Sequence, residues 1–103
     1  MSFVHLHVHT DYSALDGAIK VDELISSAVK YNMKAVAVTD HGNMACAIDF
    51  YKKAVKAGIK PIIGQEFYIA PKSRFEKTKS EDEDTAYHLI LLAENYEGYR
   101  NLM

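Results

Sequence analysis

The chain contains 103 residues, of which 49% are hydrophobic and 25% are charged, and its net charge is −2 with neutral histidines. These values are typical of one small globular domain and exclude a disordered or fibrous chain. Because there is no basic excess, the composition carries no global signal for nucleic-acid binding, although a partner that handles DNA remains compatible with it.

The single cysteine, Cys46, excludes an internal disulfide and indicates a reducing, cytoplasmic environment. No apolar run approaches the roughly 18 residues of a transmembrane helix. The first residues lack the basic and long apolar regions of a secretory signal. We therefore expect a cytoplasmic protein that has no membrane partner.

The first predicted element is a strand, because polar and apolar residues alternate in FVHLHVH at residues 3–9. Residues 9–20 have the composition of a loop. The next residues predict a helix that ends at Asn32, because apolar side chains recur at the spacing of one helical face. This face consists of Val21, Leu24, Ile25, Ala28 and Val29.

A short apolar run, AVAVT at residues 35–39, is typical of a strand that is buried on both faces. A second helix is predicted over residues 44–57, with Gly58 at its end. Its expected apolar stripe consists of Ala47, Ile48, Tyr51, Ala54 and Val55.

A third strand is predicted within residues 59–70, with Pro61 at its start because proline cannot donate to a central ladder. Residues 71–85 form a predicted polar loop, residues 87–93 a fourth strand, and residues 95–103 begin another helix. Strands that alternate with helices favour parallel pairing and right-handed crossovers. The pattern does not separate an open doubly wound sheet from a (β/α) barrel.

The alternating histidines raise the question of a metal site. Side chains that are two residues apart on a strand share a face, so His5, His7 and His9 are expected on one side. Two such imidazoles can converge on one ion at a strand end. The H-x-H pattern is short, however, and a strand with a solvated polar face fits it as well.

The strand at residues 35–39 runs into Asp40, His41 and Gly42, at the end where parallel α/β folds place their sites. Asp40 could accept a hydrogen bond from an imidazole N–H and fix its tautomer. Gly42 would let the backbone turn tightly. A simple polar turn between a strand and a helix is the alternative.

Further candidate ligands come from other segments. Glu66 interrupts an apolar strand, where a carboxylate is costly unless it is paired or bound to a metal. His88 enters another apolar run and Asp16 lies in a loop, so a core histidine and a turn aspartate are their alternatives. Together these residue types suit zinc, manganese or iron, and several metals at one site could support phosphoester hydrolysis. Ser13 has no base beside it, so we do not expect a nucleophilic triad.

The motifs LHVHTDYS, VTDHGN and GQE resemble successive motifs of the polymerase and histidinol phosphatase (PHP) domain family. The H-x-H-T-x-x-S spacing sets the frame at His7 and His9 and leaves His5 outside it. AGIKPIIGQEFYIAP and LLAENYEGYRNL resemble the branch of this family that lies at the N-terminus of the catalytic alpha subunits of bacterial replicative DNA polymerases. The resemblance covers nearly the whole chain.

The resemblance implies a distorted, TIM-like (β/α) barrel with a metal cluster at the C-terminal rim of its strands. It implies two or three divalent ions, zinc or manganese before iron or magnesium, and catalysis by His7, His9 and Glu66 through the bound metal. The implied ligands are His7, His9, Asp16, His41, Glu66 and His88. Residues 1–103 would be an incomplete PHP domain, truncated before the barrel closes, and the isolated chain is expected to self-associate.

The resemblance also implies a function for the parent protein, which would be a nucleotidyltransferase acting in DNA replication at the cytoplasmic, nucleoid-associated replisome. Its PHP site would hydrolyse phosphoesters, as in 3′-5′ exonuclease proofreading. The implied partners are DNA, the sliding clamp and an exonuclease subunit. One alternative is a stand-alone phosphoesterase of the histidinol-phosphatase kind, and another is a non-catalytic scaffold that docks a separate exonuclease.

Overall fold

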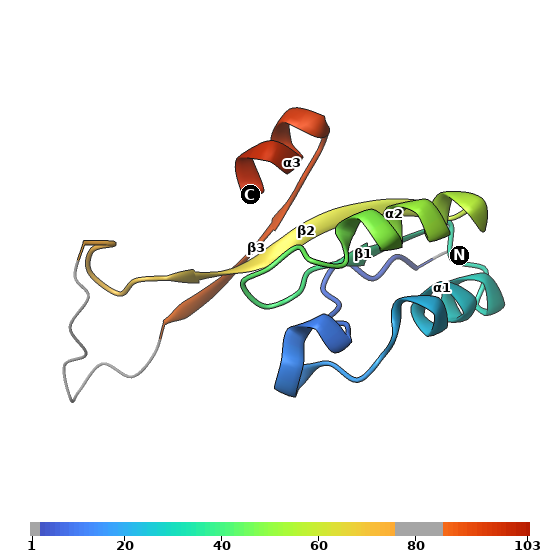
Figure 1. The fold of residues 1–103 in the computed structure, drawn as a ribbon, viewed down its shortest axis with the longest axis horizontal. Helices are drawn as coiled ribbons and strands as arrows, with labels where there is room; N and C mark the ends of the chain where they lie inside the picture. The colour runs from blue at the N-terminus through green and yellow to red at the C-terminus, as the bar shows by residue number, and fades with distance from the viewer. Residues whose placement is uncertain (1–2, 76–85) are drawn as a thin grey trace.

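The computed structural model describes residues 3–75 and 86–103. One sheet contains three strands in the order β1 (Ala35–Val38), β2 (Lys60–Ile69) and β3 (Tyr87–Leu92) (Figure 1). β1 and β2 are parallel, whereas β2 and β3 are antiparallel. The fold is therefore mixed α/β, and the expectation of parallel strands throughout is wrong for β3.

The connection between β2 and β3 explains this difference. Ile69 pairs with Tyr87, so the hairpin returns the chain at the end where β2 finishes. A parallel connection would have to carry the chain back along the sheet, which usually requires a crossover helix. The sequence between the two strands is dominated by charged and small polar residues and offers no apolar stripe for such a helix. Most of the polar loop predicted here, residues 76–85, lies outside the described residues.

The helices follow the predictions from the sequence. A short 3₁₀ helix, η1 (Asp11–Asp16), occupies the predicted loop and precedes α1 (Val21–Lys30). α1 is followed by Asn32, whose positive φ of 55° accompanies the end of the helix as predicted. α2 (Ala47–Lys56) and α3 (Tyr96–Leu102) complete the fold. Within the described part of the chain, no helix has both the length and the apolar character that crossing a membrane requires.

The hydrophobic core lies where α1 and α2 pack against β1 (Figure 1). Its largest fully buried side chain is Phe50 of α2, which the predicted stripe omitted, whereas the predicted Ile48 and Tyr51 are 58% and 52% exposed. α2 carries apolar residues on two sides, and periodicity alone does not show which side faces the core. The buried cluster consists of Val21, Leu24, Ile25, Ala28, Val36, Val38, Cys46, Phe50, Ala54 and Ile59.

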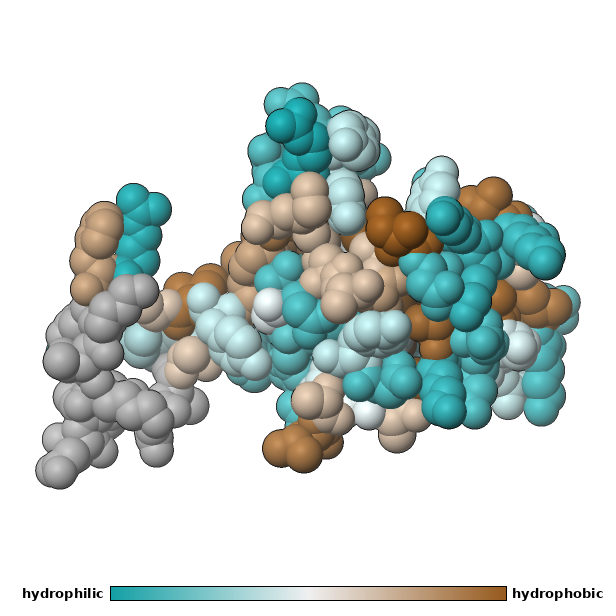
Figure 2. All heavy atoms as spheres, viewed as in Figure 1, coloured by the Kyte–Doolittle hydropathy of each residue, from teal (hydrophilic) through white to brown (hydrophobic). Residues whose placement is uncertain are grey.

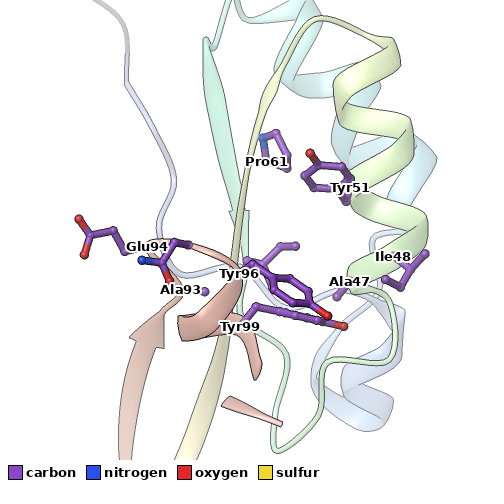
Figure 3. Close-up of a pocket in the computed structure, with 10 residues that line it drawn as sticks. Ala47, Ile48, Tyr51, Pro61, Ala93, Glu94, Tyr96 and Tyr99 are labelled. Atoms are coloured by element: carbon purple, nitrogen blue, oxygen red, sulfur yellow. The ribbon is translucent and has the colours of Figure 1, made fainter. Parts of the chain in front are cut away.

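The second apolar side of α2 faces α3. Ile48 and Tyr51 line a hollow of about 400 Å³ together with Tyr96 and Tyr99 of α3 (Figure 3). Apolar side chains reach the surface over this part of the molecule (Figure 2). Ile48 and Tyr51 are therefore part of a second apolar surface, on the side of α2 that faces α3.

The predicted strand at residues 3–9 is not a regular strand. It lies along β1, because Ala37 N donates to His5 O at 2.9 Å and Thr39 N donates to Val8 O at 2.8 Å. Between these two hydrogen bonds the N-terminal segment advances by three residues, from His5 to Val8, whereas β1 and its end advance by two, from Ala37 to Thr39. This mismatch is that of a β-bulge, and it interrupts the ladder. The hydroxyl of Thr39 replaces a ladder partner by accepting a hydrogen bond from Val8 N at 2.9 Å.

Gly64 of β2 pairs with Leu92 of β3, and the surrounding atoms leave no room for a side chain. A Cβ atom at this position would lie 2.5 Å from the carbonyl oxygen of Leu91 and 3.2 Å from Cγ2 of Thr39. Cδ2 of Leu92 would lie 2.7 Å away as well. Since the Leu91 oxygen belongs to the β3 backbone, a side chain could be accommodated only by moving β3. The three strands can therefore keep this spacing only with glycine at position 64.

Gly64→Ala is expected to lower the free energy of unfolding by about 1–3 kcal/mol, because the methyl group would overlap the β3 backbone. Urea unfolding followed by circular dichroism measures this change. Gly98→Ala is the matched control: its Cβ would lie 3.5 Å from Ala93, an ordinary contact, within a helix. The control should be neutral or stabilising by up to about 1 kcal/mol. Equal stability of Gly64→Ala and the wild type would contradict the prediction.

Candidate metal centre

The carboxylate of Glu66 lies at the centre of a cluster of histidines. Glu66 is 2% exposed in the second half of β2. Its Oε2 lies 3.2 Å from Nε2 of His7, 3.3 Å from Nδ1 of His41, and also contacts Nε2 of His9. Its Oε1 lies 2.7 Å from Nδ1 of His88. One buried carboxylate thus contacts four imidazoles that come from distant parts of the chain.

Backbone pairing places His41 beside Glu66. The parallel pairing of β1 with β2 resumes after β1 has ended, with a bridge between His41 and Glu66. Glu66 N donates to Asp40 O at 3.1 Å, and Gly42 N donates to Glu66 O at 2.9 Å. Gly42 has φ +62°, which turns the chain away from the sheet as predicted.

The antiparallel register of β3 places His88. Tyr68 pairs with His88 and Glu66 pairs with Ile90. Directly opposed residues share a face of the sheet, as do residues two apart on one strand. His88 therefore lies on the same face as Glu66. The sequence predicted that the ligands would lie at the carboxyl ends of parallel strands. His88 instead lies near the start of β3, which is antiparallel to β2.

The N-terminal segment supplies His7 and His9. Their Nε2 atoms lie 3.2 Å apart, and both face Glu66. His5 lies outside the cluster, and its ring packs edge-on against Phe3 with the centroids 4.7 Å apart. This placement matches the motif frame, which begins at His7, and departs from the strict alternation that put all three histidines together.

The two ring nitrogens of His41 have different surroundings. Oδ2 of Asp16 lies 2.8 Å from Nε2. Nδ1 is buried and has no hydrogen-bond partner among the described residues, and it faces Glu66 Oε2 at 3.3 Å without hydrogen-bond geometry. A nitrogen lone pair that faces a carboxylate is unfavourable unless a cation or a proton lies between them. The orphaned Nδ1 therefore fits a metal ligand.

Two groups of three side chains could each hold a metal ion. His7, His9 and Glu66 form one group, and His41, Glu66 and His88 form the other, with one ligand atom from each residue within 4.8 Å of the others. Imidazole and carboxylate donors in threes are typical of zinc sites that keep an open position. Asp16 contacts His41 and belongs to neither group. The hollow between α2 and α3 contributes no residue to them.

The charge of Glu66 suits a cation site. Burial opposes ionisation of this carboxyl group, but the hydrogen bond with His7 and the nearby His41 and His9 outweigh it. The pKa of Glu66 is therefore lowered below its ordinary value. The side chain carries a negative charge at neutral pH, so it can bind a cation without first losing a proton.

Within residues 3–75 and 86–103, Asp40 makes no hydrogen bond with an imidazole, which differs from the expectation. Its carboxylate accepts hydrogen bonds from Thr10 N at 2.6 Å, Ser13 Oγ at 2.7 Å and Cys46 Sγ at 3.1 Å. Ser13 Oγ in turn accepts a hydrogen bond from His41 N at 3.1 Å. This network was not predicted from the sequence, although Thr10 and Ser13 are the Thr and Ser of the H-x-H-T-x-x-S motif. Both oxygens of Asp40 thus accept hydrogen bonds from these donors.

Comparison with known families agrees with the geometry. The family described as the PHP domain matches residues 5–103 of the chain. The chain belongs to the PHP domain family. The matched range contains His7, His9, Asp16, His41, Glu66 and His88.

Several curated proteins resemble this PHP domain chain. It is 58% identical over 101 residues to DNA polymerase III subunit alpha of Borreliella burgdorferi, a match of 98% of the chain and 9% of that protein. The same protein of Treponema pallidum is 52% identical over 103 residues, and that of Aquifex aeolicus 50% over 106 residues. These matches cover 100% and 98% of the chain and 9% of each relative. The chain thus spans less than a tenth of the length of these relatives.

The buried thiol of Cys46, which donates a hydrogen bond to Asp40, provides a test of the packing in this PHP domain. Cys46 is 1% exposed, and burial, followed by the hydrogen bond to Asp40, raises its pKa from 9.0 to about 12. At pH 9 the native thiol should react with a disulfide reagent at least ~100-fold more slowly than the unfolded chain, because little thiolate forms. The folded state holds the thiol proton more tightly than the unfolded chain does, so protonation of Cys46 stabilises the fold. This contribution to the free energy of unfolding is complete below about pH 9 and is lost as the pH rises towards about 12. Equal rates in native buffer and in denaturant would contradict the prediction.

Proposed function

We propose that this PHP domain chain binds divalent metal ions and contributes to metal-dependent hydrolysis of phosphoester bonds. The observation that supports this proposal best is the contact of one buried carboxylate with four imidazoles, one of which has an unpaired ring nitrogen. A structural role alone would not require a buried imidazole nitrogen to face a carboxylate without a hydrogen bond, as Nδ1 of His41 does. The proposed ligands are His7, His9, Asp16, His41, Glu66 and His88.

The nature of the donors narrows the choice of metal. The imidazole ligands favour zinc or iron over magnesium, and the carboxylates of Glu66 and Asp16 also suit manganese. We propose zinc or manganese, with two or three ions in a complete domain. The two groups of ligands that share Glu66 support a site for two ions. Asp16, beside His41, offers one further oxygen ligand.

The residues of the centre can act without a protein nucleophile. A bound divalent cation would lower the pKa of water and stabilise charge on a phosphate. The side chain of His7 is 57% exposed and that of Asp16 63%, so the centre is open on this side to a substrate. Ser13 is unavailable as a nucleophile, because its hydroxyl is buried and hydrogen-bonded to Asp40.

The names of the relatives support a proposal for the wider function. We propose that the chain serves as the N-terminal part of the catalytic alpha subunit of a bacterial replicative DNA polymerase, and that the PHP centre acts there as a 3′-5′ exonuclease. The support is the name and the 98–100% coverage of this chain in the three matches. The proposed partners are DNA, the sliding clamp and an exonuclease subunit at the replisome in the cytoplasm.

Replacing Glu66 tests metal binding. Glu66→Gln removes the charge but keeps the size, and it should weaken zinc or manganese binding by about 100-fold, because it removes the oxygen ligand common to both groups. Isothermal titration calorimetry measures the affinity. Glu23→Gln, an exposed carboxylate in the first turn of α1, is the matched control and should bind metal as the wild type does. Equal affinity of Glu66→Gln and the wild type would refute the metal centre.

Replacing His7 tests the activity. In the full-length protein that carries this chain, His7→Ala should reduce Mn²⁺-dependent removal of nucleotides from a DNA 3′ end by at least ~10-fold, because it removes one ligand. DNA synthesis by the same preparation is the internal control and should be unchanged. A nuclease activity that is independent of His7 would contradict the proposal. A wild-type protein with no metal-dependent nuclease activity would favour the scaffold alternative.

A further inference from the structure

Asp40 is a buried carboxylate that the proposed chemistry does not use. It is 1% exposed. Its two oxygens accept hydrogen bonds from Thr10 and Ser13, at the start of η1, and from Cys46, at the start of α2. Within the described residues, none of these partners carries a positive charge. Neutral N–H, O–H and S–H donors alone therefore compensate its charge.

Such a carboxylate holds its neighbours firmly. Hydrogen bonds to an ionised acceptor are shorter and about twice as strong as those between neutral groups. The bonds from Thr10 N and Ser13 Oγ, at 2.6 Å and 2.7 Å, are of this short kind. A neutral residue at position 40 would hold the same groups less tightly.

One part of this network reaches the N-terminal ligands. Thr10 follows His9 directly, and its backbone N–H donates to Asp40 Oδ1. The hydroxyl of Thr10 also donates to Asp40, at 2.9 Å from Oδ2. The peptide between His9 and Thr10 is therefore fixed relative to the loop that follows β1.

Another part reaches His41 and Glu66. Ser13 Oγ donates to Asp40 and accepts from His41 N at 3.1 Å, so the hydroxyl relays the position of Asp40 to the backbone of His41. The main-chain oxygen of Asp40 accepts from Glu66 N at 3.1 Å. Asp40 is thus linked to the backbone at His41 and Glu66, as well as to the peptide after His9.

We propose that Asp40 is the positioning residue of the metal centre, and that it sets the placement of His9 directly through Thr10 and that of His41 through the Ser13 hydroxyl. The inference rests on the proposed metal binding. The rings of His9 and His41 have centroids only 3.9 Å apart. The two residues belong to segments that are distant in the sequence, since the paired residues Val8 and Thr39 just before them are 31 positions apart. A shared internal anchor explains how two rings from separate loops keep this spacing.

Ser13→Ala tests the relay without removing Asp40 or any proposed ligand. It should lower zinc affinity by about 10–100-fold, the range found for groups that orient ligands. It should also speed hydrogen exchange of the His41 amide in the metal-free protein, because that N–H loses its acceptor. Ser26→Ala is the matched control, since it removes an exposed hydroxyl that donates to Asp22 O on α1. The control should leave both measurements unchanged.

Two further variants separate positioning from general loss of stability. Asp40→Asn keeps the shape but loses the charge, so it should weaken zinc binding at least as much as Ser13→Ala does and should speed exchange of both the Thr10 and His41 amides. Phe50→Leu disturbs the core, where Phe50 is fully buried, and lies outside the network. It should lower the free energy of unfolding and leave zinc affinity at the wild-type value.

The measurements distinguish the two proposals. Wild-type zinc affinity in both Ser13→Ala and Asp40→Asn would overturn the positioning role. Equal loss of affinity in Phe50→Leu at matched stability would also overturn it, because any loosening of the fold would then suffice. If the wild type binds no zinc, the metal proposal fails by itself. Even without zinc binding, hydrogen exchange tests the link from Asp40 through Ser13 to His41. An unchanged exchange rate of the His41 amide in Ser13→Ala would overturn that link.

Discussion

A carboxylate buried inside a β-strand has to be compensated, and this requirement connects the parts of the molecule. Glu66 is 2% exposed, and its partners come from the N-terminal segment, the loop after β1 and the β2–β3 hairpin. An isolated buried charge would cost several kcal/mol. Each of these segments must therefore be held in place by its own backbone contacts before the carboxylate can stay ionised at this position.

The two buried acids of the centre are compensated in different ways. Asp40 is surrounded by N–H, O–H and S–H groups that act as hydrogen-bond donors to it. Glu66 is surrounded by imidazoles, whose ring nitrogens can act as metal ligands. The first arrangement fixes a backbone, whereas the second leaves donor atoms available for a ligand. The difference lies in the chemistry of the neighbours, since both carboxylates are almost fully buried.

Much of the local structure could be predicted from the sequence. The periodicity indicated α1, the strand at β1 and the limits of β2, and the cost of burying Glu66 correctly pointed to compensating partners. The irregular N-terminal segment could not be predicted, because it depends on the Thr39 hydroxyl taking the place of a backbone partner. The buried side of α2 and the partners of Asp40 could not be predicted either. Both depend on which of several apolar or polar groups another segment reaches.

The direction of β3 shows how chemistry can constrain topology where periodicity does not. His88 is the second residue of its strand, whereas Glu66 lies in the second half of β2. In a parallel pair of aligned strands, an early residue and a late residue lie at opposite ends of the sheet. Only antiparallel pairing brings them together, and the observed register does so. The expectation of a shared ligand cluster and that of a fully parallel sheet were therefore incompatible, and the positions of the two residues within their strands decide between them.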